Sequence, residues 1–263
     1  MIPNLLHGSL KQVQGFLLIL MRVSPILFMM PLLNARNLPN LLKVGLALAV
    51  SLVLWPVVPL DGSLFPTDPY GFGFFLISEL MIGFLLGLSV QLVFAGVQLG
   101  GELAGFQMGL SMASAIDPQS GVDTTLIAQL YYLLALLIFL SIDGHHWFFR
   151  ALVRSFQVLA PGEFVLKGPL YRHFLDLSGR IFLIALQIAA PVMAILFLIQ
   201  IALGILARTV PQVNILMSSF PLTISLGLIF LGLSLDLLWP HLKNLLEEFG
   251  KGLVFTLLPL MKR

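Results

Sequence analysis

The chain has 263 residues, of which 59% are hydrophobic and only 10% are charged. A soluble domain carries about 25% charged residues, so this composition excludes an ordinary soluble domain and indicates a membrane or membrane-assembly protein. The sequence contains no cysteine, which excludes disulfides and thiolate chemistry, and its net charge of +2 comes from scattered residues that predict no nucleic-acid-binding surface.

Six apolar segments follow one another along the chain and predict an all-α fold. Their approximate ranges are 14–33, 41–58, 70–105, 125–142, 174–207 and 215–238. The first segment resembles a signal peptide but lacks a small-residue cleavage site, so we expect it to be retained. Residues 241–263 form a mildly amphipathic tail, which we expect to lie at an interface or on a partner rather than to form a seventh span.

Two of these segments are longer than a bilayer requires. The hydrocarbon core takes about 20 helical residues. Segments 70–105 and 174–207 must therefore tilt, kink or leave the bilayer. Pro191 lies inside the second of them and predicts a kink, because it removes one backbone hydrogen bond and clashes with the preceding turn.

The third segment also carries glycines at a spacing of four. They are Gly83, Gly87, Gly96, Gly100, Gly101 and Gly105. Residues four apart share one face of a helix, and a glycine face lets another backbone approach closely. We expect close helix packing on this face, including packing by partner chains; the alternative is that some of these glycines are merely tolerated.

The distribution of positive charge does not fit six full spans. Arg36 and Lys43 place the first connector on the cytoplasmic side. Strict alternation then places residues 143–173, the densest basic stretch, on the opposite side, and the reverse orientation misplaces the first connector instead. We infer that some apolar segments do not cross the bilayer but are buried against other proteins.

Several ionisable residues lie in or beside apolar segments, where they need protein partners or water. They are Arg22, Glu79, Glu102, Asp176, Arg180 and Asp236. Asp176 and Arg180 are four apart and are expected to pair along one helix. Glu79 and Glu102 have no local partner and could meet Arg22, Arg208 or another chain. A proton relay is the alternative, but the scattered positions give it little support.

The sequence Asp143-Gly144-His145-His146 suggests either a metal site or a helix end. A metal needs three or four ligands with fixed geometry, and adjacent histidines on a helix are expected to point in different directions. We therefore expect these residues to cap the preceding helix and to bind no metal. No nucleophile elbow, phosphate-binding loop or dinucleotide fingerprint is present, so we expect no catalytic residue and no cofactor.

Residues 106–121 suit neither lipid nor water. They contain small residues, Met108 and Met112, and no charge before Asp117, and Pro118 ends any helix there. Such a segment is expected inside a protein assembly.

Several motifs follow one another along the chain: Arg22-Val23-Ser24-Pro25 with Pro31-Leu32-Leu33, residues 109–113 followed by residues 117–121, Asp143-Gly144-His145-His146, and residues 208–214. In this order and spacing they resemble the FliR family, the R-type export-gate subunits of flagellar type III secretion. The resemblance covers nearly the whole chain. It implies a structural role for the family-motif residues Asp143, Gly144, His145, Arg208, Pro211, Gln212 and Asn214.

The resemblance implies a fold of bent helical hairpins within a hetero-oligomeric export gate. Residues 1–165 would form a part like the P-type subunit, and residues 166–263 a hairpin like the Q-type subunit. The implied partners are P-type and Q-type subunits (FliP, FliQ), the FlhB switch subunit, membrane lipid and unfolded export substrates. The implied location is the bacterial inner membrane at the flagellar basal body, with much of the chain held toward the periplasm.

The resemblance further implies that a loop of this subunit plugs the closed export pore. The plug residues would be Phe106, Gln107, Met108, Gly109, Leu110, Ser111, Met112, Ala113, Ile116, Asp117 and Pro118. Flexible methionines can seal an irregular gap, and an apolar plug can exclude ions by dewetting. The alternatives are an ordinary packed loop, a subunit of a virulence-type injectisome, or a small-solute secondary transporter, which would show two similar halves with paired broken helices.

Overall fold

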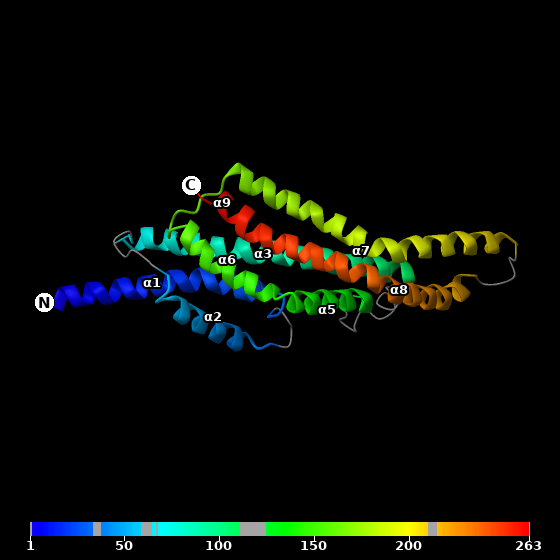
Figure 1. Cartoon of the computed structure of the whole chain (residues 1–263), viewed down its shortest axis with the longest axis horizontal. Helices are drawn as coiled ribbons and strands as arrows, with labels where there is room; N and C mark the ends of the chain where they lie inside the picture. The colour runs from blue at the N-terminus through cyan, green and yellow to red at the C-terminus, as the bar shows by residue number, and fades with distance from the viewer. Residues whose placement is uncertain are drawn as a thin grey trace. The chain divides into compact units, whose positions relative to one another are not determined.

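A computed structural model describes residues 2–33, 38–58, 65–66, 68–110, 125–209 and 215–262, without the side chains of residues 2–9 and 215–218. All regular secondary structure in these residues is helical (Figure 1). The elements are α1 (Ile2–Met29), α2 (Asn40–Leu54), α3 (Pro69–Met108), α5 (Leu126–Ser141), α6 (Gly144–Val158), α7 (Gly168–Thr209), α8 (Ile215–Gly252), η3 (Leu253–Leu257) and α9 (Leu258–Leu260). The prediction of an all-α membrane protein is confirmed.

Among the residues that the structure describes, four helical stretches are long and apolar enough to cross a membrane. Three lie within α1, α3 and α7, the fourth runs from Ser219 in α8 to Leu260, and the bent pair α5 and α6 makes a fifth span if the two are counted together. The 15 residues of α2 are apolar but short. The helices α3 and α7, of 40 and 42 residues, confirm the two over-long segments, and Pro191 lies inside α7, which changes direction along its length (Figure 1).

Several sequence-based boundaries were wrong. The predicted first segment begins near residue 14, whereas α1 begins at Ile2. Residues 143–173 are predicted as a connector, yet they contain α6, whose buried side chains Phe148, Ala151, Leu152 and Ser155 repeat at helical spacing. The sixth segment is predicted to end near residue 238, before a tail from residue 241, whereas α8 continues through Pro240 to Gly252. The buried residues Leu238, Leu242 and Leu246 form one apolar stripe across the proline, and this packing offsets the lost backbone hydrogen bond.

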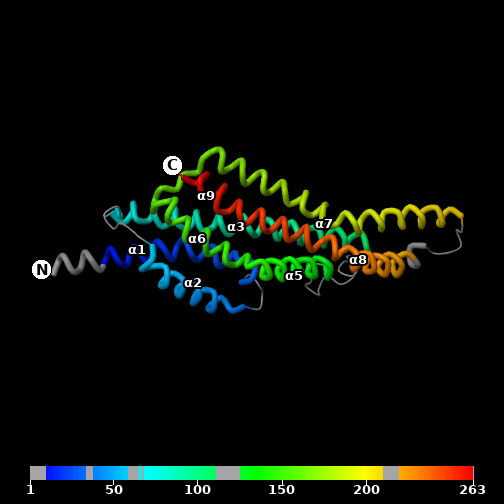
Figure 2. Tube along the Cα trace, in the orientation of Figure 1, coloured from blue at the N-terminus to red at the C-terminus, as the bar shows by residue number. Residues whose placement is uncertain are grey.

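The chain divides into two compact units. Unit 1 comprises Met1–Gln91, Asp143–Asp176 and Glu247–Arg263. In it α1 and α2 pack as an antiparallel hairpin, which the trace in Figure 2 shows clearly, and α6 contacts η3 and α9. The buried core of this unit includes Leu18, Ile19 and Ile82.

Unit 2 comprises Leu92–Ile142 and Leu177–Leu246. It contains the second half of α3, all of α5, and most of α7 and α8. Its buried side chains come from all four helices and include Val97, Ala128, Ile188 and Leu231. These two units are defined by contacts within this chain and differ from residues 1–165 and 166–263. The likeness of those two ranges to P-type and Q-type subunits therefore stays a prediction.

Candidate functional site

The described part of the 106–121 segment is a well-formed helix end in unit 2. Gly109 has a φ of +89°, its N–H donates to the Phe106 carbonyl over 3.0 Å, and the N–H of Leu110 donates to the Gly105 carbonyl over 3.0 Å. These two bonds make a Schellman motif, which requires a left-handed residue after the helix and so favours glycine. Gly109 therefore ends α3 at Met108.

Met108 is fully buried at this helix end. Its side chain lies against α8 so closely that a Cβ added to Gly227 would be 2.6 Å from Met108 Cγ. The hydroxyl of Thr223 donates to the Met108 carbonyl over 3.1 Å, and Gln107 Nε2 donates to the Met193 carbonyl over 3.2 Å. Both bonds tie the end of α3 to other helices of unit 2. Phe106, by contrast, is 72% exposed.

The segment re-enters the fold beside the point where it leaves. Thr125 is the N-cap of α5, and its hydroxyl accepts a hydrogen bond from the N–H of Ala128. A Cβ added to Gly105 would lie 2.8 Å from Thr125 Oγ1. The two ends of the segment are thus in contact within unit 2. Residues 111–124, which include Ser111, Met112, Ala113, Ile116, Asp117 and Pro118, lie outside the described residues.

The glycines that were expected to support close packing lie against other helices of this chain. In unit 1, Gly83 faces the carbonyl of Arg22 and Gly87 faces Met29, both on α1. In unit 2 the neighbours are Ile184 for Gly96, Ala185 and Ile188 for Gly100, Ala128 for Gly101 and Thr125 for Gly105. A Cβ at Gly101 would lie 2.5 Å from the Cα of Ala128. A larger residue there would force the neighbouring helix to shift.

Arg22 lies at the centre of a buried polar cluster in unit 1. Both Arg22 and Glu79 have fully buried side chains, and Arg22 Nε donates to Glu79 Oε2. The other guanidinium nitrogens donate to Ser155 Oγ and to the Leu159 carbonyl, each over 3.2 Å. The guanidinium carbon lies 4.1 Å from the ring centroid of Phe156. One arginine thus joins α1, α3 and the C-terminal end of α6.

Sequence reasoning named Arg22 among the candidate partners of Glu79, and the structure selects it. It missed Ser155, Phe156 and Leu159, because their helix was not predicted. The amphipathic spacing of residues 148–155 was the signal that could have found α6. Asp176 and Arg180 are both exposed and form no ion pair in the described structure, so that expected pair is wrong.

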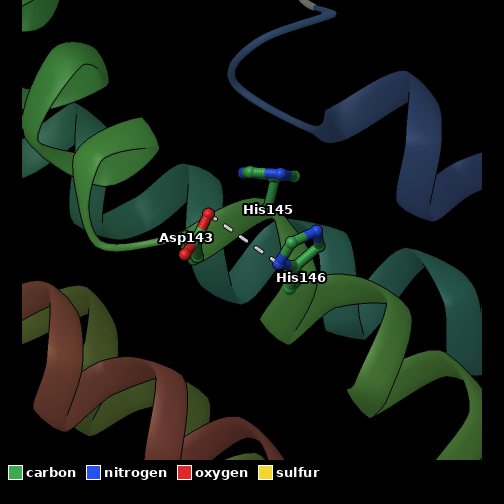
Figure 3. Close-up of side chains that lie close together, drawn as sticks. All are labelled: Asp143, His145 and His146. Atoms are coloured by element: carbon green, nitrogen blue, oxygen red, sulfur yellow. Dashed lines mark ion pairs between the residues drawn. The ribbon is translucent and has the colours of Figure 1, made fainter.

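Asp143, His145 and His146 lie together at the start of α6 (Figure 3). Asp143 has a φ of +54°, and its side chain makes no capping hydrogen bond. His146 Nδ1 lies 3.8 Å from Asp143 Oδ1, and the two imidazole ring centroids are 4.2 Å apart. The expectation that these adjacent histidines point apart was therefore wrong, and Asp143 does not cap with its side chain. The helix α5 does end at Ser141, just before this motif.

The remaining sequence-predicted residues are spread through the chain. Arg208 is exposed in the last turn of α7, while Pro211, Gln212 and Asn214 lie outside the described residues. Glu102 is half-buried on α3, and Asp236 is exposed on α8. Both carboxylates belong to unit 2, whereas the Arg22 cluster belongs to unit 1.

Comparisons with known proteins identify relatives along most of the chain. A family model described as bacterial export proteins, family 1, matches residues 13–249. Flagellar biosynthetic protein FliR of Pectobacterium carotovorum is 36% identical over 231 residues, which are 86% of each chain. FliR of Bacillus subtilis is 34% identical over 88% of this chain and 89% of the relative, and FliR of Escherichia coli K12 is 33% identical over 87% of each. The chain therefore belongs to family 1 of the bacterial export proteins, the FliR family.

Proposed function

We propose that this chain is a structural and gating subunit of the flagellar type III protein-export channel. Membership of the FliR family supports a place in the flagellar export apparatus, and the apolar helices support a membrane-embedded subunit. The family is one of export subunits rather than of enzymes, so the chain holds and gates a passage and performs no chemistry. The export substrates are unfolded proteins, and the energy for their movement is supplied elsewhere.

The segment of residues 106–121 acts as the plug of the closed pore. The observation that carries this assignment is the anchoring of its two ends: Gly105 contacts Thr125, and the Schellman turn at Gly109 fixes the exit from α3. A plug needs a rigid base and a displaceable body. The base consists of Met108, Gly109 and Thr125, and the body consists of the residues between them.

This division changes the part assigned to each methionine. Met108 is buried against Gly227 and serves to hold the base rather than to seal the pore. Met112 belongs to the body, where a flexible thioether side chain can fill an irregular gap. An apolar body excludes ions without needing a fixed geometry. The same segment can therefore close the pore and move aside when a substrate enters.

The partners are the P-type and Q-type subunits and FlhB, in the inner membrane at the flagellar basal body. Residues 1–165 resemble the P-type subunit and residues 166–263 the Q-type hairpin. Large apolar side chains remain exposed on the isolated chain, among them Leu41 on α2, Phe182 on α7 and Leu237 on α8. We expect lipid or partner chains to cover an exposed apolar surface of this extent.

Replacement of the plug body tests the assignment. Residues 111–120 are exchanged for a Gly-Ser sequence of equal length, which leaves the anchored base intact. The assembled export complex is reconstituted in planar bilayers, and its ion conductance is measured. We expect a clear rise in conductance, because a hydrated flexible chain cannot keep the pore dry.

The matched control is a Gly-Ser exchange of residues 59–64, the connector between α2 and α3. It perturbs a connector of the same chain but not the plug, and it should leave the closed complex non-conducting. Unchanged conductance in the 111–120 variant, with the complex intact, would remove the plug assignment while leaving the place in the export apparatus untouched.

A further inference from the structure

We propose that Asp143, His145 and His146 bind a divalent transition-metal ion of the zinc class at the junction between α5 and α6. One potential ligand atom from each residue lies within 4.8 Å of the other two. Figure 3 shows the Asp143 carboxylate and the two imidazoles close together beside the first turn of α6. This inference does not depend on the gating function proposed above.

The donor set determines the class of metal. Two imidazole nitrogens and one carboxylate oxygen suit zinc, nickel and cobalt, whereas calcium and magnesium prefer oxygen donors throughout. The chain contains no cysteine, which removes the softer thiolate sites. Three protein ligands leave at least one position for water, as in open zinc sites.

The distances are compatible with coordination after small side-chain rotations. Bonds of about 2.1 Å place ligand atoms roughly 3.4 Å apart in a tetrahedral site. Asp143 Oδ1 and His146 Nδ1 are already 3.8 Å apart. These two side chains are 71% and 55% exposed, so they can rotate to bring the remaining separations inward without disturbing a packed core.

His145 supplies a second and independent observation. Its Nδ1 atom is buried and has no hydrogen-bond partner in the described structure. A buried ring nitrogen is normally satisfied by a protein group, a water molecule or a metal ion. The Asp143–His146 ion pair alone does not involve His145, whereas a metal site would give this imidazole a polar partner.

A bound ion would fix the turn that links the two helices. It would tie Asp143, which precedes α6 and has a left-handed backbone, to two side chains in the first turn of that helix. Because the unfolded chain does not hold the three ligands together, binding should favour the folded state. We therefore expect the ion to raise the melting temperature of the chain.

The test uses the full chain, purified in detergent without a polyhistidine tag and stripped with a chelator. Zinc binding is measured by calorimetry, and cobalt is used as a spectroscopic probe because its visible absorption reports the ligand geometry. The wild type should bind one equivalent of zinc and gain in melting temperature. His146→Gln and Asp143→Asn should each weaken binding by at least about ten-fold, and the double change His145→Gln/His146→Gln should abolish it.

The control variant is His173→Gln, which changes a histidine on α7 and should bind zinc like the wild type. Each variant is checked for a monodisperse elution profile and unchanged helical circular dichroism, so that misfolding is recognised separately. Zinc binding by the wild type no tighter than by the His145→Gln/His146→Gln variant would overturn the proposal. So would equal loss of binding in the His173→Gln control.

Discussion

The Arg22 guanidinium shows how a single residue can organise several helices. Removing two charges from water is costly, so a buried ion pair persists only where hydrogen bonds satisfy the remaining donors. Arg22 meets this condition through Glu79, Ser155 and the Leu159 carbonyl. The sequence predicted that Arg22 and Glu79 need protein partners, but residues 57 positions apart cannot be paired from one sequence.

Substitutions at this pair should be strongly non-additive. Arg22→Met leaves the Glu79 carboxylate buried without its partner, which should cost about 3–5 kcal/mol of unfolding free energy. Arg22→Met/Glu79→Met removes both charges and should recover most of that loss. The free energy is measured by SDS titration of the purified chain in mixed micelles.

Arg180→Met serves as the control for this experiment, because Arg180 is exposed on α7 and makes no ion pair in the described structure. It should change the free energy of unfolding by less than about 0.5 kcal/mol. If the double variant were less stable than Arg22→Met alone, the buried charge would not be the cause of the loss.

For the helices, the sequence predicted that a helix is present more accurately than it predicted where the helix begins and ends. The spacing of apolar residues located α3 and α5 within about three positions, because each is a continuous apolar run, and it located α7 except for its polar first turn. It failed for α6, because the polar residues around Asp143 favour a connector rather than a helix. It failed again at Pro240, because a proline lowers helix stability locally while the packing of Leu238 and Leu242 acts through the tertiary fold.

The candidate site was likewise predicted in part. Glycines four apart could be assigned to one helix face from the sequence, but the identity of the opposing helix could not. Gly83 meets α1 whereas Gly101 meets α5, and only the tertiary structure separates these cases. The clustering of His145 with His146 was missed because it depends on side-chain rotamers and on the left-handed backbone of Asp143.

Packing of α5 on α3 leads to a paired prediction on two glycines. Gly101→Ala should destabilise the chain by about 1–3 kcal/mol, because the new Cβ meets the Ala128 backbone, which cannot move aside cheaply. Gly204→Ala on α7 adds the same methyl group where nothing lies within 4 Å. It should be neutral or stabilising by up to about 1 kcal/mol, since alanine favours a helix over glycine. SDS titration of both variants measures the difference, and equal effects would contradict the close approach.

For the whole molecule, helix length limits which segments cross the bilayer. A hydrocarbon core is about 30 Å thick, and each residue of an α-helix adds about 1.5 Å. The helices α3, α7 and α8 exceed that thickness by a wide margin. The 15 residues of α2 do not reach it, since they span only about 22 Å. Six apolar segments therefore need not give six spans, and we expect, as the uneven distribution of basic residues also indicates, that some of them do not cross the bilayer.

The short α2 helix allows the topology to be tested directly. If α2 does not cross the bilayer, the connectors on its two sides lie on the same side of the membrane. The absence of cysteine makes single-cysteine labelling unambiguous. Asn34→Cys and Ser63→Cys are each labelled with a membrane-impermeant maleimide in right-side-out and in inside-out vesicles. We expect the two positions to react in the same vesicle preparation, with detergent-lysed vesicles as the control for intrinsic reactivity. Reaction in opposite preparations would mean that α2 crosses the membrane despite its length, through local thinning or an extension of the helix at its ends.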